Sequence, residues 1–597
     1  MKLNTYLFKG VLTVFVGLFL ISCEGDFLQR DPVTEITKDK FFNSPQDLET
    51  YSNGFYSYIS APYMDVFSDN ISIYTGANNT DNLLRGSLTP ANVDGWDWKE
   101  LRSINYMIEN SGKATGDQSL IRHYKGVAKF FRANFYFNMV KKYGDVPWYS
   151  KTIGSNDDEM LYKAKDPRTL VMDSIMGDLE YASANVLPAR TNNTMITKWA
   201  ALTLLARVAL YEGSFRKYHD ELGLQSSSGK FLNRAVTASQ DIMTNGGFNI
   251  YNTGKGGEDF RSLFASNMLD GNKEVIFLQK NNKDQGVSNN THTVLGWQWA
   301  LNGSLADEFL MKDGTPFTSI TGYDKKGFTE VFANRDPRMA ETIMPPGFAT
   351  IPGGDPYLVQ PVFGGYLQIK FYPRDPSLRG GWNLNYTDLP IYRYAEVLLI
   401  NAEAKAELGS LTQGDLDNTV NLLRRRVKMP DLSMVAANSN PDNYLVQQYP
   451  NINGSNKGVI LEIRRERRVE LACEDKRLDD LFRWKSGVLL GQPSKGFYTS
   501  ALGAIDVTGD GKQDIAILEA PGKEDPLNGL PADIRAHLTK YYISDGVFYL
   551  SNVTSGHIMF DKDKILPRTF VNPKYYYLPI PISQLILNPK LTQPPGW

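Results

Sequence analysis

Residues 199–213, WAALTLLARVALYEG, decide the fold of this chain. Apolar side chains recur there at spacings of three and four, which is typical of a buried helix. Small alanines leave room for a second helix at close range, and Gly213 is expected to end the first one. Because a second helical pattern follows around residues 233–236, the sequence predicts two antiparallel helices in contact.

The same pairing recurs further along the chain. Residues 392–408 and 416–427 predict a second pair, again with several alanines at the close contact. Helix pairs of this kind repeat at about 34 residues in regular tetratricopeptide arrays, but here the spacing is irregular. We therefore expect a mostly α-helical scaffold of tetratricopeptide-like pairs with large insertions. The predicted helices are 45–59, 98–110, 121–143, 169–185, 197–212, 231–244, 390–408, 416–427 and 458–484.

Long loops are predicted between these helices. Residues 246–386 are rich in Gly, Pro, Asn and aromatic residues, with brief apolar runs that favour a few short strands, and residues 486–570 are similar. The length of the chain indicates two domains or one large composite fold. The predicted divisions are a signal peptide over 1–22, a tether over 23–40, an N-terminal helical region over 41–250 and a C-terminal region with loop insertions over 251–597.

The first 23 residues are typical of a bacterial lipoprotein signal. Lys2 and Lys9 precede an uncharged apolar run over residues 11–21, and small Ser22 stands just before Cys23. This pattern predicts cleavage before Cys23 and acylation of its thiol. An ordinary secretory peptide that contains a cysteine is the alternative. A membrane anchor is disfavoured, because a spanning helix needs about 20 apolar residues and acidic residues follow Cys23 at once.

Composition excludes some classes of partner. The formal charge of −2 becomes −4 once the two signal lysines leave, so there is no basic field for nucleic acid and no polybasic membrane patch. Membrane attachment would then depend on the lipid. If Cys23 carries lipid, Cys473 is the only other cysteine and no intramolecular disulfide forms. The aromatic content of 12% leaves rings for exposed platforms, although Tyr is also ordinary filler in loop-rich proteins.

The usual enzyme motifs are missing from the sequence. There is no phosphate-binding loop, no dinucleotide fingerprint, no H-E-x-x-H and no G-x-S-x-G, and the five histidines are far apart. Metal-dependent hydrolysis and serine-type acyl transfer are therefore poorly supported. The paired carboxylates of a glycosidase stay open as an alternative, because those residues can be distant in sequence.

Residues 506–514, DVTGDGKQD, are the sharpest local motif. Asp506, Thr508, Asp510 and Asp514 place side-chain oxygens at positions 1, 3, 5 and 9 of a calcium-type loop, with glycine at position 6. Position 12 is Ile517 and not a bidentate Glu, which excludes an EF-hand. A structural Ca²⁺ loop and an ordinary Asp- and Gly-rich surface turn are both consistent with this pattern.

Two tryptophan pairs are candidates for ligand binding. Trp96 and Trp98, and Trp297 and Trp299, lie near expected boundaries between loops and helices, with polar residues beside them. Indole faces stack on the apolar faces of sugar rings while amides and carboxylates bind the hydroxyls, so such clusters suit a carbohydrate platform. Burial in the core is the alternative for each Trp, since most tryptophans are largely buried.

The helix predicted over residues 458–484 carries dense alternating charge. Opposite charges meet at a spacing of three, as in Glu462 and Arg465. Because acids and bases nearly balance, we expect a helix held by ion pairs to neighbouring segments and not an anion-binding site.

Several segments together resemble the SusD/RagB family of outer-membrane nutrient-uptake lipoproteins. They lie in the expected order over nearly the whole chain, and the combination is far more specific than any one of them. They are the acylation signal ending at Cys23 with DFL at 26–28, FFNSP at 41–45, AKFFRANFYF at 128–137 with YGDVPW at 143–148, YRYAEVLL at 392–399, IRRERRVE at 463–470 with RLDDLFRW at 477–484, YLPIP at 577–581 and NPKLTQP at 588–594.

The resemblance implies a mostly α-helical SusD-like fold that supports a loop-rich ligand face. It also implies a lipid-anchored position on the outer membrane facing the cell exterior, and a partnership with a SusC-like TonB-dependent barrel. No catalysis is implied. Trp96 and Trp98 lie in a segment that resembles a contributor to the aromatic arc of starch-binding members. We therefore expect a non-enzymatic oligosaccharide-binding lipoprotein. The alternatives are a lipoprotein that binds peptides or another nutrient, and a surface glycosidase.

Overall fold

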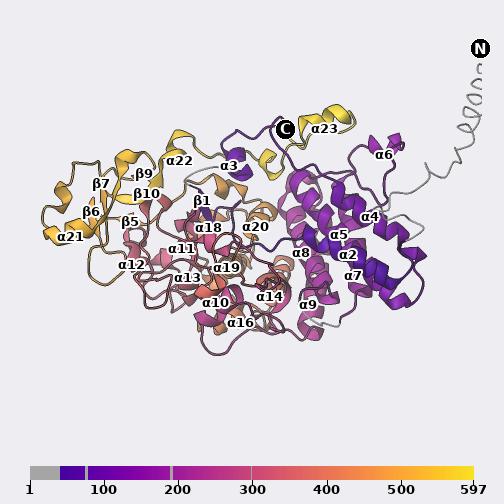
Figure 1. The fold of residues 1–597 in the computed structure, drawn as a ribbon, viewed down its shortest axis with the longest axis horizontal. Coiled ribbons are helices and arrows are strands. Elements are labelled where there is room, and N and C mark those ends of the chain that lie inside the picture. The colour runs from indigo at the N-terminus through magenta and orange to yellow at the C-terminus, as the bar shows by residue number, and fades with distance from the viewer. Residues whose placement is uncertain (1–40, 74–77, 189–192, 298) are drawn as a thin grey trace, which may run out of the picture.

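The computed structural model describes residues 41–73, 78–188, 193–297 and 299–597. Over these residues the chain is mostly helical, and its strands form four small sheets. Figure 1 shows the long helices of the N-terminal half gathered at one end of an elongated molecule, and a group of C-terminal strands at the other end. The mostly α-helical fold with few short strands is therefore confirmed.

Seven longer helices form the scaffold. They are α4 (Lys99–Asn110), α5 (Gln118–Tyr143), α7 (Arg168–Asn185), α8 (Lys198–Tyr218), α9 (Ser228–Asn245), α14 (Tyr394–Leu408) and α19 (Lys457–Glu470). Each packs on the next in this order, so the scaffold is a row of neighbouring helices. The row matches the tetratricopeptide-like architecture that the helix pairs predict.

Shorter helices connect and flank this row. They are α2 (Pro45–Asn53), α3 (Asn79–Leu84), α6 (Asp158–Leu161), α10 (Gly257–Ala265), α11 (Gly303–Glu308), α12 (Phe328–Val331), α13 (Pro337–Thr342), α15 (Gln413–Asp417), α16 (Val420–Arg426), α17 (Met434–Ser439), α18 (Asn443–Gln448), α20 (Arg477–Arg483), α21 (Ala532–His537), α22 (Asp561–Ile565) and α23 (Ile582–Leu587).

The contact between α8 and α9 explains why small side chains recur in the segment 199–213. Thr197 caps α8 by accepting a hydrogen bond from the Ala200 amide at 3.3 Å. A β-carbon on Gly213 would lie 2.8 Å from the Leu232 side chain of α9, so only glycine allows this approach. The expectation that Gly213 ends the helix is wrong, because α8 continues to Tyr218. The glycine serves the helix contact instead.

The helix predicted over residues 458–484 is interrupted by a turn. The α19 helix ends at Glu470 and α20 begins at Arg477. Between them Cys473 and Asp475 have positive φ angles of 66° and 55°. The buried Asp65 carboxylate holds this conformation by accepting the amides of Cys473 at 2.6 Å and Asp475 at 2.8 Å. A single continuous helix is therefore wrong here, because a distant carboxylate stabilises the break.

The small sheets pair strands that are far apart in sequence. Strand β1 (Ile71–Ile73) pairs antiparallel with β3 (Trp299–Leu301), and β2 (Val275–Gln279) pairs antiparallel with β4 (Leu389–Arg393). Two three-stranded sheets lie in the C-terminal part, ordered β5-β10-β9 and β6-β7-β8. Their strands are β5 (Tyr498–Thr499), β6 (Gly503–Ile505), β7 (Ile515–Leu518), β8 (Thr539–Tyr542), β9 (Phe548–Leu550) and β10 (Gly556–Phe560).

Two large hydrophobic clusters support the two parts of the molecule. The first lies among the scaffold helices and includes buried C-terminal residues such as Tyr576 and Ile580. The second lies beneath the middle loops and includes Phe264, Leu305 and Phe497. Because the chain returns to the first cluster at its end, residues near 142 and 578 are hydrogen-bonded, with the Leu578 amide donating to the Lys142 carbonyl at 2.7 Å.

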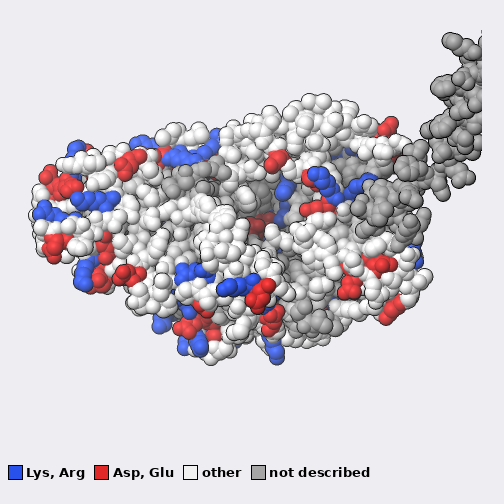
Figure 2. Space-filling model, in the orientation of Figure 1, with Lys and Arg blue, Asp and Glu red and all other residues white. Residues whose placement is uncertain are grey.

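Most charged side chains of α19 are buried, and they form ion pairs with other elements. Glu470 is fully buried and contacts the guanidinium groups of Arg426 at 2.6 Å, Arg393 at 2.7 Å and Arg338 at 2.9 Å. Glu462 and Arg465 pair within the helix at 2.5 Å. The prediction of a helix held by ion pairs is confirmed. On the surface, acidic and basic side chains are interspersed over the face drawn in Figure 2.

Candidate functional site

An exposed pair of tryptophans is the most conspicuous surface feature of the loops. The rings of Trp297 and Trp382 have centroids 4.7 Å apart and planes inclined by 49°. Their side chains are 42% and 57% exposed, respectively. Large aromatic side chains normally bury most of their surface. Two indoles that meet in solvent contribute little to the core, so their position needs another explanation.

Hydrogen bonds fix the loop that carries Trp382. The Asn290 side chain donates a hydrogen bond to the side-chain oxygen Oδ1 of Asn383 at 2.5 Å. It also accepts a hydrogen bond from the Asn383 backbone amide. Ser288 donates to the Asn383 backbone carbonyl at 2.5 Å. Asn289 and Asn385 exchange backbone hydrogen bonds at 2.9 and 3.2 Å. Residues 288–290 and 383–385 are thereby joined next to Trp382, which reduces the ordering that a ligand would have to impose.

The surroundings of the pair offer both stacking and hydrogen bonding. Indole faces can cover the apolar face of a sugar ring, and polar groups beside them can bind its hydroxyls. Asn383 is exposed, and among the residues that the structure describes its Nδ2 donates to no partner. The inclined planes of the two rings favour a chain of linked rings over a single flat aromatic ligand.

Trp382 was missed by sequence reasoning, although a signal was present. It follows Gly380 and Gly381 in an Asn-rich stretch of the long predicted loop region. A bulky ring in such a stretch has few neighbours of its own and tends to be exposed. Its partner on the surface depends on hydrogen bonds across about ninety residues of sequence, which no local pattern reports.

Trp299 does not join this pair. It begins strand β3, opposite Ile73 of β1, and it packs partly buried against the second hydrophobic cluster. Trp297 precedes the strand and lies outside it. The indole nitrogen of Trp299 is buried and has no hydrogen-bond partner among the described residues.

Trp96 and Trp98 do lie together, at the edge of the first hydrophobic cluster. Their centroids are 5.2 Å apart in a T-shaped arrangement. Trp96 also contacts Tyr143 at 4.9 Å, and Trp98 contacts Tyr149 at 5.5 Å. Both are half-buried. These contacts give the two rings a packing role that Trp297 and Trp382 do not have.

The same two tryptophans line a pocket of about 510 Å³. Apolar groups such as Leu161, Leu587 and Leu591 form much of its wall, and Lys99 and Arg102 lie at its α4 side. This volume is within the usual range for small-molecule sites. The pocket therefore stays a second candidate for ligand binding, built between α4 and α23.

The Asp506 loop joins β6 to β7 and makes its own hydrogen bonds. Asp506 accepts the amides of Gly509 at 2.6 Å and Gly511 at 2.9 Å. Asp514 accepts the amides of Val507 and Thr508 at 2.8 and 2.9 Å, and Asp510 accepts that of Lys512. Over the described parts of the chain, no group of three or more His, Cys, Asp or Glu side chains is placed to hold a metal ion. Backbone amides thus occupy oxygens of Asp506, Asp510 and Asp514, whereas the buried Thr508 hydroxyl has no hydrogen-bond partner among the described residues, and calcium binding stays a prediction.

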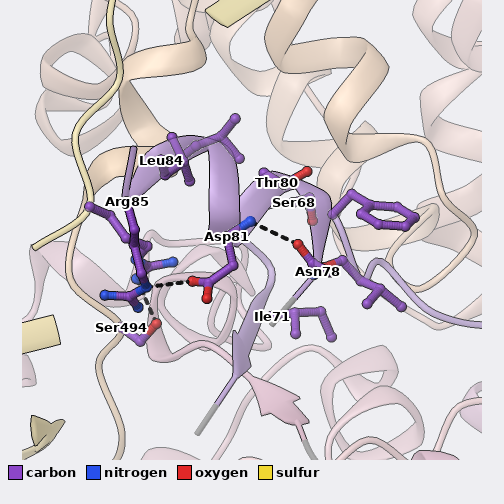
Figure 3. A pocket seen from close by; sticks show the side chains of 12 residues that line it. Ser68, Ile71, Asn78, Thr80, Asp81, Leu84, Arg85 and Ser494 are labelled. Carbon is purple, nitrogen blue, oxygen red and sulfur yellow. Dashed lines mark hydrogen bonds and ion pairs between the residues drawn. The ribbon is translucent and has the colours of Figure 1, made fainter. Parts of the chain in front are cut away.

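A small cavity beside α3 has a structural role. Figure 3 shows Asn78 accepting the Asp81 amide, at 2.8 Å, and Asp81 facing Arg85. Arg85 pairs with Asp81 at 2.9 Å and with Asp563 of the C-terminal segment at 2.7 Å. The cavity of about 20 Å³ holds one water at most. These contacts tie α3 to the C-terminal segment and leave no room for a nutrient.

The predicted lipidation site lies outside the described residues, as do the signal peptide and tether over 1–40. In the parts of the chain that the structure describes, no helix combines the length and the apolar character that crossing a bilayer requires.

The fold and the exposed aromatic site together define a helical-repeat binding protein, and comparison with known proteins identifies its family. The SusD family model matches residues 360–597. A second model, described as starch-binding and associating with the outer membrane, matches residues 26–210. The two matches lie in the N-terminal and the C-terminal parts of the chain, which is therefore SusD-like.

Relatives and solved structures agree with this assignment. SusD-like protein P2 of Formosa agariphila is 25% identical to this chain and aligns with 79% of it and 89% of its own length. The crystal structure of a SusD-like protein from Bacteroides fragilis has a TM-score of 0.68 at 21% identity, covering 95% of this chain and 100% of that chain. A SusD-like carbohydrate binding protein from the same species has a TM-score of 0.66 at 21% identity, covering 92% and 100%.

Proposed function

We propose that this protein is a non-enzymatic, cell-surface lipoprotein that captures oligosaccharides and delivers them to a SusC-like TonB-dependent outer-membrane transporter. The observation that carries the proposal is the exposed pair of Trp297 and Trp382, held in place by hydrogen bonds between their loops. The match of residues 26–210 to a model described as starch-binding supports the class of ligand. Capture near a transporter raises the local concentration of substrate, and modest affinity permits release.

The experiment compares two double variants of the purified chain by calorimetric titration with a panel of oligosaccharides that includes starch fragments. Trp297→Ala with Trp382→Ala should lower affinity at least about tenfold, since each ring contributes roughly 1 kcal/mol. The melting temperature should hardly change, because both side chains are exposed. The matched control, Trp96→Ala with Trp98→Ala, should lower the melting temperature, because those rings pack on Tyr143 and Tyr149.

Three outcomes would contradict the proposal. If the Trp297 and Trp382 double variant kept its oligosaccharide affinity, the exposed pair would not be the binding site. Binding of peptides and of no glycan would favour the alternative nutrient receptor. Release of shorter sugars from the panel over hours by the purified wild-type protein would indicate a glycosidase.

A further inference from the structure

A second cavity lies where the scaffold helices meet the loop-rich part of the molecule. It has a volume of about 390 Å³ and is lined by residues 58–67, by α5 and α8, and by the turn before α20. Ile59 on its wall packs against the first hydrophobic cluster, and Met64 packs against the second. Figure 2 shows acidic and basic atoms at a hollow near the middle of the face, close to where Figure 1 places α8 and α20. The cavity shares no residue with the Trp297–Trp382 pair.

Asp475 reaches this cavity from a backbone conformation that non-glycine residues seldom adopt. Its φ angle is 55°, and the Asp65 carboxylate accepts its backbone amide at 2.8 Å. Asp65 is itself buried and also accepts from the Asn70 side chain at 2.8 Å. The turn is therefore held by a dedicated buried acid, and it presents the Asp475 side chain to the cavity. Unusual backbone conformations that the surroundings enforce are concentrated at functional sites.

Most charges around the cavity are paired, but the Asp475 carboxylate is not. Lys141 pairs with Asp479 at 2.8 Å, and Arg207 pairs with Glu396 at 2.6 Å. Within the described parts of the chain the Asp475 side chain has neither a hydrogen bond nor an ion pair, although it is exposed to the cavity. Although the side chain is exposed, partial removal from bulk water raises the pKa of Asp475, opposed in part by Lys476.

Two amide side chains face the same cavity without partners. Asn134 and Asn138 lie four residues apart on α5, on one face of the helix, and both line the cavity. Neither amide makes a hydrogen bond within the part of the chain that the structure describes. Lys476 uses one of its hydrogens on the Glu474 carbonyl, at 2.8 Å, which leaves two more. The Asp475 carboxylate and the amide oxygens are thus available as acceptors, and the amide nitrogens and Lys476 are available as donors.

The balance of charge decides the class of ligand. Lys141, Arg207 and Lys476 are opposed by Asp475, Asp479 and Glu396, so the site as a whole is neutral and favours a neutral ligand. A carboxylate that can accept hydroxyl groups, in a cavity also lined by amides and by apolar groups such as Met64, suits a polyhydroxy compound.

We propose that this cavity is a second binding site, separate from the exposed tryptophan pair, that holds a neutral polyhydroxy molecule of about one sugar unit, with the Asp475 carboxylate accepting its hydroxyl groups. The proposal goes beyond oligosaccharide capture and does not depend on it.

The test uses saturation-transfer NMR on the purified chain with D-glucose, D-galactose, D-mannose, D-xylose and glycerol as probes at millimolar concentration. At least one probe should bind the wild type. Asp475→Asn should weaken that binding about tenfold or more, because hydrogen bonds to a charged acceptor are the stronger ones. Asn tolerates a positive φ, so the fold and the melting temperature should be preserved. Asn138→Leu, which removes one free amide, should weaken the same binding.

The Trp297→Ala, Trp382→Ala background separates this site from the exposed pair. Binding of the small probe should persist there even where oligosaccharide affinity is lost, and loss of probe binding in that background would overturn the proposal. Absence of binding by every probe to the wild type would also overturn it, as would an Asp475→Asn variant that binds like the wild type. Glycine at the same concentration is the comparison probe, and tighter binding of glycine than of any sugar would show that the ligand class is wrong.

Discussion

At the level of single residues, Glu470 is a buried acid that pairs with three arginines. Three arginines from α13, β4 and α16 meet its carboxylate in the fully buried interior. Burial alone would raise its pKa, but Arg426, Arg393 and Arg338 outweigh burial and hold the pKa well below the usual range. Since the folded state favours the ionised form, this group stabilises the protein above its unfolded pKa of about 4.3.

Replacing Glu470 by Gln should destabilise the protein by about 3–5 kcal/mol at neutral pH, because three buried arginines lose their shared partner. The stability that Glu470 contributes should decline as pH falls below about 4.3 towards the low folded pKa, so the gap between variant and wild type should narrow there. Urea unfolding at pH 7 and at successively lower pH measures both effects.

Glu519→Gln is the matched control for that experiment. Glu519 pairs with Lys523 on the surface, with both side chains 59% exposed. Such exposed pairs contribute at most about 1 kcal/mol. An equal loss of stability in the two variants, or a difference that widens in acid, would contradict the role assigned to Glu470.

At the level of elements, the motif of the Asp506 loop is consistent with both a Ca²⁺ loop and an ordinary surface turn. Its glycines at 509 and 511 have positive φ, and its aspartates accept the loop amides. These bonds stabilise the connection between β6 and β7 without a metal. A bound Ca²⁺ would add a second stabilising contribution from the same oxygens.

We expect Ca²⁺ in excess over its dissociation constant to raise the melting temperature. At a hundredfold excess the free energy of unfolding should increase by about 2.7 kcal/mol. Asp510→Asn should abolish the increase, because Asp510 is exposed at the loop and supplies one of the predicted ligand oxygens. Differential scanning fluorimetry in CaCl₂ and in EDTA provides the measurement. Identical melting in the two solutions would leave the loop as a surface turn.

At the level of the whole molecule, the sequence predicts that lipid on Cys23 attaches the protein to a membrane. The formal net charge of −2 supplies no general electrostatic attraction to anionic lipid. Cys23→Ala should move the protein from the membrane fraction to the soluble fraction, since one or more acyl chains would be lost and no electrostatic attraction replaces them. Immunoblotting of fractionated cells measures this. Ser22→Ala, which keeps a small residue before the cysteine, is the control and should stay membrane-bound; retention of Cys23→Ala at the wild-type level would contradict lipidation.

The folded body itself is held together by contacts between distant parts of the chain. The C-terminal segment returns to the N-terminal helices at Leu578, and β1 pairs with β3 across more than two hundred residues. The junction between the two hydrophobic clusters is incomplete, and the cavity with Asp475 occupies it. The proposed second site thus exists only because the two parts of the molecule meet there.

The sequence by itself determined the helical scaffold, because apolar spacing and small residues such as those of residues 199–213 act between near neighbours. It also indicated the ion-paired character of α19, because acids and bases nearly balance over the predicted segment 458–484. Tertiary structure alone decided that Trp297 meets Trp382 and not Trp299, and that the Asp475 carboxylate lines a cavity and has no partner in the described part of the chain. The reason is that these positions depend on hydrogen bonds from Asn290 and Asp65, which lie about ninety and four hundred residues away and leave no periodic trace in the sequence.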